Sequence, residues 1–221
     1  MVVGLGSGAT ASYFVEALGA ALRSGQLKDI SGIPTSQATA ELAARYAIPL
    51  TNLAEHAWLD LAVDGADEVD PQLNLIKGLG RAMMREKIVE IYARQFIVVV
   101  DESKQVARLG THFPVPVEIL PFGAEAHLGW LNSLGCTAEL WREEDGSPVT
   151  TENCNFLARC WFVDKDRLGD PAGNRLVGIP DPYAFERRLA GRPGILGHGL
   201  FLDMASVVIV AGADGVKILE R

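Results

Sequence analysis

The sequence contains few cysteines, and their number and spacing exclude two kinds of protein. The 221 residues include three cysteines, Cys136, Cys154 and Cys160, with no CxxC pair among them. A disulfide framework would need an even and denser set, and a structural zinc site would need paired ligands. We therefore expect reduced thiols, either buried in a core or on the surface. The four histidines are dispersed along the chain, so we expect no metal site.

Positive charge is also scarce, and no long apolar run is present. Lysine and arginine total 20 against 28 aspartates and glutamates, which gives a net charge of -8. Binding to nucleic acid or to an anionic membrane needs a basic face, so we expect neither partner. No apolar run approaches the roughly 20 residues of a membrane-spanning helix, and no signal sequence is recognisable. The expected location is the cytoplasm, and a small anionic substrate would need locally placed positive charge.

The pattern of apolar residues predicts an α/β fold. With 48% hydrophobic and 22% charged residues, the chain can bury a core. Strand-like runs alternate with helical patterns, which is typical of a parallel sheet with crossover helices. The expected strands are residues 1–3, 30–36, 61–63 and 96–100. One expected helix follows residue 10 and runs to about residue 23, and the others are residues 37–46 and 80–94.

One of these helices carries both an apolar stripe and an acid. Met84, Ile88, Ile91 and Tyr92 lie on one side of the 80–94 helix, and we expect that side to face the core. Glu86 is offset from this stripe. Taken alone, it is more readily interpreted as a solvated helical glutamate than as a base.

Prolines near residue 114 mark a change to a second domain. Residues 115–120, 137–142 and 155–163 are strand-like, and residues 124–134 and 183–189 are helical, with a Gly- and Pro-rich loop at 164–182. This order predicts a small α+β domain of the ferredoxin-like type. The domain boundaries predicted here are 1–114 plus 200–221 for a Rossmann-like domain and 115–199 for the smaller one. A terminal hairpin, 207–211 with 216–219, returns to the first sheet.

The first glycine-rich segment predicts an anion site. Residues 4–10, Gly-Leu-Gly-Ser-Gly-Ala-Thr, lie between a strand and a helix. Free N–H groups at a helix start favour phosphate, and Ser7 and Thr10 add hydroxyl donors. A dinucleotide loop would require an acid at the end of the second strand. That strand ends in Thr35-Ser36, so we favour a sugar phosphate, although a tight turn without a ligand stays open.

A second group of polar residues can carry acid–base chemistry. Asp64 and Asp67 follow a buried strand, at the strand end where α/β sheets bind ligands. Lys77 precedes two glycines at a helix start, where it could stabilise an oxyanion. The structural alternatives are helix-capping acids and a solvated lysine. The partnership of Asp64, Asp67, Lys77 and Glu86 favours proton transfer on a small substrate.

These segments, in this order, resemble the A-type ribose-5-phosphate isomerases. The resemblance rests on GLGSGAT, DGADEVD, KGLGRAMMREKI, DESKQV, FPVPVEILP, the TTEN-x-N stretch and GLFLDMASVVIVAGADGVKIL. It covers nearly the whole chain. It implies a Rossmann-like domain with a smaller α+β domain, a homodimer or homotetramer, and a reaction without metal or cofactor. It also implies a helix and a complete first strand ahead of the glycine loop, and we expect their lack to reduce stability or activity.

The resemblance also implies a role for each site residue. Glu86 would be the general base, Asp64 and Asp67 would bind the sugar and assist ring opening, and Lys77 would stabilise the enediolate. The implied substrate-binding residues are Ser7, Gly8, Ala9, Thr10, Asp64, Gly65, Ala66, Asp67, Lys77, Gly78, Leu79, Gly80 and Lys104. The reaction would interconvert ribose 5-phosphate and ribulose 5-phosphate. The alternatives are a non-catalytic sugar-phosphate sensor and a nucleotide-dependent dehydrogenase.

Three positions depart from the family pattern. The family loop reads K-G-G-G followed by small residues, whereas this chain has Leu79 and Arg81. Arg81 adds a positive charge that could bind phosphate or obstruct it. Ala9 stands where a serine is common, which removes one hydroxyl.

Overall fold

The computed structural model describes residues 1–164 and 176–221. Its chain divides into two compact units. The first unit comprises residues 1–66, 85–104 and 203–221, and the second comprises residues 67–84 and 105–202. Residues 67–84 and 105–114, which we expected in the Rossmann-like domain, therefore belong to the second unit. The Rossmann-like and small-domain boundaries given above stay a prediction.

The first unit is built on a six-stranded sheet, which confirms the predicted α/β class. Its strands are β1 (Val2–Leu5), β2 (Ser31–Pro34), β3 (Leu61–Asp64), β6 (Phe96–Asp101), β12 (Val207–Gly212) and β13 (Gly215–Glu220). The spatial order is β13-β12-β6-β3-β1-β2, and every pair is parallel except the terminal hairpin. This is a doubly wound order, 2-1-3-4-5 with one antiparallel edge strand, and its switch point lies between β1 and β3.

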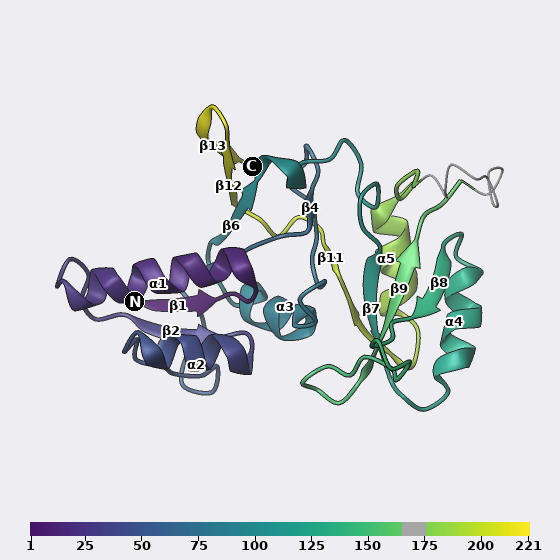
Figure 1. The fold of residues 1–221 in the computed structure, drawn as a ribbon, viewed down its shortest axis with the longest axis horizontal. Coiled ribbons are helices and arrows are strands. Elements are labelled where there is room, and N and C mark those ends of the chain that lie inside the picture. The colour runs from purple at the N-terminus through teal and green to yellow at the C-terminus, as the bar shows by residue number, and fades with distance from the viewer. Residues whose placement is uncertain (165–175) are drawn as a thin grey trace. The chain divides into compact units, whose positions relative to one another are not determined.

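Helices α1 (Ala9–Arg23) and α2 (Gln37–Arg45) cover one face of this sheet, beside β1 and β2 in Figure 1. Alternation along β1 explains the arrangement, since successive side chains point to opposite faces. Val3 and Leu5 pack with Val15 and Leu18 of α1. Gly4 points the other way, toward Val89.

Helix α3 (Met83–Ile91) is buried on a different face from the one predicted. The exposed fractions of Ile88, Ile91 and Tyr92 are 42%, 62% and 44%, so the prediction that this stripe faces the core was wrong. Glu86 and Val89 are instead 4% exposed. These two residues are three positions apart and share a face, and Val89 is the side chain that meets Gly4 of β1. The acid interpreted as solvated therefore lies on the buried side.

The second unit carries a four-stranded antiparallel sheet. Strands β7 (Val115–Ile119), β8 (Thr137–Leu140), β9 (Phe156–Trp161) and β10 (Ile195–His198) are arranged in the order β10-β7-β9-β8. Helix α4 (Ala124–Asn132) follows β7, and α5 (Pro182–Ala190) precedes β10. The resulting βαββαβ order confirms the predicted ferredoxin-like fold. Residues 165–175 of the predicted 164–182 loop lie outside the described residues.

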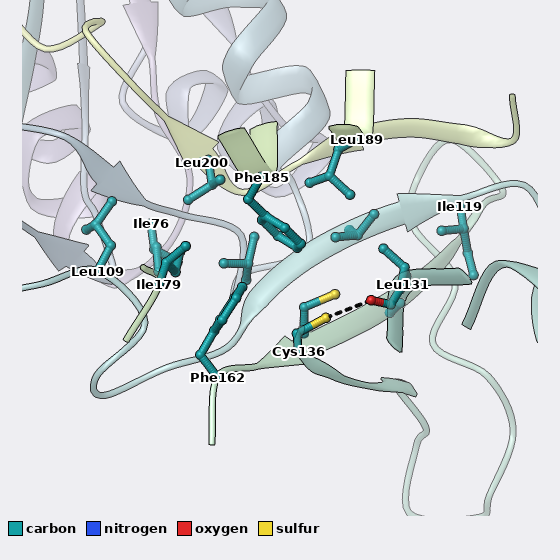
Figure 2. Close-up of a cluster of buried hydrophobic side chains, with 14 of the residues drawn as sticks. Ile76, Leu109, Ile119, Leu131, Cys136, Phe162, Ile179, Phe185, Leu189 and Leu200 are labelled. Atoms are coloured by element: carbon teal, nitrogen blue, oxygen red, sulfur yellow. Dashed lines mark hydrogen bonds between the residues drawn. The ribbon is translucent and has the colours of Figure 1, made fainter. Parts of the chain in front are cut away.

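Apolar side chains from both helices and the sheet form the core of this unit (Figure 2). Phe185 of α5 packs edge-on against Phe162, with ring centres 5.1 Å apart. The three cysteines form no disulfide: Cys136 and Cys160 are buried here, and Cys154 is exposed. A hydrogen bond with Cys136 and burial raise the pKa of the Cys160 thiol, which keeps it protonated.

A small three-stranded sheet in the second unit was not predicted. It joins β4 (Glu68–Val69), β5 (Leu75–Ile76) and β11 (Leu200–Phe201), all antiparallel. These strands are two residues long, too short for a periodic signal in the sequence. Among the described residues, no helix has the length and apolar character needed to cross a membrane.

Two buried carboxylates hold loops of the second unit. Glu118 of β7 accepts hydrogen bonds from Thr151, Asn153 and Asn155, which accounts for the TTEN-x-N segment. Glu68 accepts three backbone N–H groups, from Gly110, His112 and Phe113, at 2.5 to 2.7 Å. The last acid of the DGADE segment is therefore structural.

We expect Glu68→Ala to lower the free energy of unfolding by at least about 3 kcal/mol, because it leaves buried N–H donors without an acceptor. Denaturant unfolding measures the loss. Glu144→Ala, at an exposed position, is the control and should change stability by less than about 0.5 kcal/mol. Equal effects of the two substitutions would contradict the structural role of Glu68.

Candidate active site

The first unit places two predicted site segments at the switch point of its sheet. β1 pairs with β2 on one side and β3 on the other, and the chain leaves β1 and β3 at their carboxyl ends. Asp64 is the last residue of β3 and is 1% exposed, and the glycine loop follows β1. Ligands of doubly wound proteins bind at this point.

Asp64 is hydrogen-bonded to the glycine loop itself. Its Oδ1 accepts the N–H of Ser7 at 3.1 Å and the N–H of Gly65 at 2.7 Å. A Cβ atom on Gly6 would lie 2.1 Å from the Asp64 carboxyl carbon. Glycine is therefore required at position 6 so that the carboxylate can lie across the loop.

The first turn of α1 follows this loop. Gly8 is the N-cap residue, with φ of 93°, and it provides no side-chain hydrogen bond to the first turn. Ala9 and Thr10 begin the helix, and no acid lies in its first turn. A helix start without a side-chain cap favours an anion, since its N–H groups and dipole both point outward.

Sequence reasoning missed a group of hydroxyls that surrounds Ser7. The Ser7 hydroxyl lies 2.7 Å from those of Thr35 and Ser36 and 3.2 Å from that of Thr39. Thr39 also donates to the carbonyl of Gly6 at 3.0 Å. The signal was present, because Ser36 caps α2 by accepting the N–H of Thr39. The second strand thus ends in hydroxyls that contact the loop, which agrees with a sugar phosphate rather than a dinucleotide.

Two further predicted residues belong to the first unit. Glu86 lies on the buried face of α3, as described above. Lys104 ends the 3₁₀ turn η1 (Glu102–Lys104), directly after β6. The turn is held by Asp101, which accepts the hydroxyl and the N–H of Ser103, and the hydroxyl contact most strongly lowers the pKa of Asp101.

The second unit holds Asp67 and the Lys77 loop together. Asp67 Oδ2 accepts the N–H of Leu79 at 3.0 Å, and the N–H of Asp67 donates to Ile76 at 2.8 Å. The N–H of Lys77 donates to Gly199 at 2.8 Å. The Asp67 carboxylate and the lysine loop are therefore joined by backbone hydrogen bonds within the second unit.

The conformation of this loop depends on its backbone. Gly78 has φ of 114°, which favours glycine, and a Cβ atom there would lie 2.9 Å from Cβ of Met83. Leu79 contributes its N–H to Asp67, so its side chain does not prevent that contact. Lys77 is 3% exposed, and its Nζ lies 5.4 Å from the ring centre of Phe201. Burial beside a ring restricts where the ammonium group can reach.

Taken by unit, the structure brings Ser7, Thr10, Asp64 and Gly65 together in the first, and Asp67, Lys77, Gly78 and Leu79 in the second. Ala66 ends the first segment of the first unit, and a Cβ atom at Gly80 would meet nothing within 4 Å. Within the described ranges, no three His, Cys, Asp or Glu side chains gather as a metal-binding group.

The fold defines a class: a doubly wound α/β unit with a ferredoxin-like unit, in which a glycine loop follows β1 and Asp64 and Asp67 accept backbone N–H groups. Comparison with known proteins gives the family. The family model described as "Ribose 5-phosphate isomerase A (phosphoriboisomerase A)" matches residues 31–215. The chain belongs to the ribose-5-phosphate isomerase A family.

Relatives match along the entire chain. Ribose-5-phosphate isomerase A of Roseiflexus castenholzii is 44% identical over 220 residues, which cover all of this chain and 88% of the relative. A solved D-ribose-5-phosphate isomerase in complex with phospho-erythronic acid is 42% identical, with a TM-score of 0.91, covering 100% of this chain and 91% of the other. The enzyme of Methanocaldococcus jannaschii is 37% identical, with a TM-score of 0.88 and the same coverage.

The close approach at Gly6 gives a testable prediction. We expect Gly6→Ala to push the Asp64 carboxylate off the loop and to lower the free energy of unfolding by about 1–3 kcal/mol, the usual cost of overpacking. Denaturant unfolding measures the cost. Gly129→Ala is the matched control, because a Cβ atom there meets nothing within 4 Å and the residue lies in α4. A Gly6→Ala protein as stable as the control would show that the contact is misplaced.

Proposed function

We propose that this protein interconverts D-ribose 5-phosphate and D-ribulose 5-phosphate through a cis-enediolate. Membership of the family makes it an aldose–ketose isomerase, an enzyme of the non-oxidative pentose phosphate pathway. The observation that carries the proposed site is the buried Asp64 carboxylate bonded to the glycine loop. The solved relative that binds phospho-erythronic acid supports a phosphorylated sugar as the substrate.

In this proposal the glycine loop binds the phosphate. Backbone N–H groups at Gly8, Ala9 and Thr10 begin α1, and the helix dipole adds to their attraction for an anion. Ser7 is fixed by its neighbouring hydroxyls. Lys104, after β6 of the same sheet, adds local positive charge in a chain whose net charge is -8.

The proton transfer is assigned to Glu86. Its carboxylate takes the proton from C2 of the open-chain aldose, which leaves an enediolate, and returns that proton to C1 to form the ketose. Asp64 and Asp67 bind the sugar, assist ring opening and move the proton between the two oxygens. Lys77 stabilises the negative charge on the enediolate oxygen. Acid–base catalysis of this kind typically contributes about 10²–10⁴-fold to the rate, and oxyanion stabilisation adds to it.

The remaining substrate contacts are proposed on the same basis. Gly65 and Ala66 continue the backbone after Asp64, and Gly78, Leu79 and Gly80 continue it after Lys77. These segments offer backbone groups to the sugar hydroxyls. The sensor alternative is not favoured, because the relatives and the solved structures are the enzyme.

We further propose a homodimer or homotetramer acting in the cytoplasm without metal or cofactor. Three cysteines without a disulfide suit a reducing compartment. Light scattering after gel filtration should give a mass of two or four times 23.8 kDa. A monomeric mass for the active protein would contradict the oligomeric part of the proposal.

The base is tested by Glu86→Gln, which keeps the side-chain volume but removes the carboxylate. We expect ribose 5-phosphate turnover to fall by at least about 10³-fold, with far-UV circular dichroism unchanged. The matched control is Glu41→Gln on the exposed side of α2, which should retain full turnover. All assays contain EDTA. Near-normal isomerisation by Glu86→Gln would exclude it as the base, and loss of wild-type activity in EDTA would exclude a metal-free reaction.

A further inference from the structure

The lysine loop ends at a residue whose backbone conformation is unusual for its type. Arg81 has φ of 68°, in the left-handed region that costs free energy for residues with a side chain. Its N–H donates to the Gly78 carbonyl at 2.9 Å, which closes a four-residue turn over 78–81. A non-glycine residue remains in this conformation where its surroundings hold it.

The side chain of Arg81 makes the contacts that hold it. Both terminal nitrogens donate to Glu143, at 2.6 and 3.0 Å to its two carboxylate oxygens. The guanidinium carbon also lies 5.3 Å from the ring centre of Trp141. A bidentate pair fixes direction as well as distance, because the planar guanidinium matches the carboxylate. The Arg81 guanidinium is therefore directed at Glu143.

The partners of Arg81 are themselves anchored in the second unit. Glu143 belongs to a tight turn, in which its N–H donates to Ser147 and its carbonyl accepts from Gly146. The backbone of Trp141 bonds to Leu157 and Val149. These bonds fix the backbone of both partners of Arg81.

A second arginine supports the same ring. Arg159 of β9 also lies 5.3 Å from the Trp141 ring centre, and it pairs with Glu139 of β8 at 2.7 Å. Glu139 in turn accepts the indole N–H of Trp161 at 2.9 Å. The Trp141 ring is thus placed by the sheet, and Arg81 docks onto a surface that is already ordered.

We propose that Arg81 is a positioning residue, and that the Arg81–Glu143–Trp141 clamp sets the orientation of the Lys77 loop. The loop is tied at alternate residues: Lys77 to Gly199, Leu79 to Asp67, and Arg81 to Glu143. The third tie fixes the end of the loop that leads into α3. The inference rests on the proposed function, in which Lys77 stabilises the enediolate.

Positioning predicts an effect on catalysis with little effect on stability. The Arg81 and Glu143 side chains are 40% and 41% exposed, and ion pairs with this exposure contribute little to global stability. A loop freed at one end would displace Lys77 from the developing negative charge, and a misplacement of about 1 Å can cost about 10²-fold in rate. Since that charge exists in the transition state, kcat should fall while KM stays nearly constant.

The test measures kcat, KM and melting temperature for Arg81→Ala, Glu143→Ala and the double variant. We expect each single variant to lose about 10- to 100-fold in kcat with KM changed by less than about twofold. The double variant should lose no more than the single ones, because they remove one clamp. Arg81→Gly relieves the left-handed backbone but should lose the same activity, and Arg81→Lys should recover only part of it. Glu144→Ala is the matched control.

Three kinetic outcomes would overturn the proposal: a rise in KM alone, additive losses in the double variant, or full activity of Arg81→Ala. Amide hydrogen exchange of residues 78–80 is measured without substrate, and it should become at least about tenfold faster in both single variants. This measurement separates a failure of the proposed function from a failure of the clamp. An inactive wild-type protein would refute the proposed function, and unchanged exchange would refute the clamp.

Discussion

The contact between the Asp64 carboxylate and the glycine loop is the constraint on which the first unit's site depends. It requires β1 and β3 to be neighbours, which the doubly wound order provides, and it requires a glycine at position 6. The same contact fixes Ser7, whose hydroxyl then reaches the end of β2 and the start of α2. One carboxylate thereby couples three strand ends at the point where an anion would bind.

How much the sequence predicted depended on the length of each pattern. The parallel sheet and the ferredoxin-like order follow from long alternating runs, and both were predicted. The buried face of α3 was predicted wrongly, because an apolar stripe at Ile88 and Ile91 outweighed a single acid in a periodicity argument. Tertiary packing against Gly4 decided otherwise. The position of Glu86 depends on a glycine 82 positions earlier, a relation that no local pattern contains.

The acids of the DGADE segment show why residue type alone could not assign roles. Asp64 bonds to the glycine loop, Asp67 to Leu79, and Glu68 to three backbone N–H groups of a distant segment. Successive side chains along the backbone point in different directions, so the adjacent Asp67 and Glu68 contact different segments. The sequence proposed Asp64 and Asp67 as site residues and these roles stay a prediction, whereas the structural role of Glu68 needed the coordinates, because its three partners lie more than 40 positions away.

The lysine loop illustrates how a departure from a family pattern can be compensated. Glycine adopts left-handed backbone at little cost, whereas arginine at position 81 must be held in that conformation. Here the guanidinium that replaces a small side chain also provides the contact that holds it, through Glu143 and Trp141. The backbone strain and the ion pair are therefore best regarded as one feature. Losing the pair while keeping the arginine would remove the contact that fixes this end of the loop, so position 81 and position 143 constrain each other in this chain.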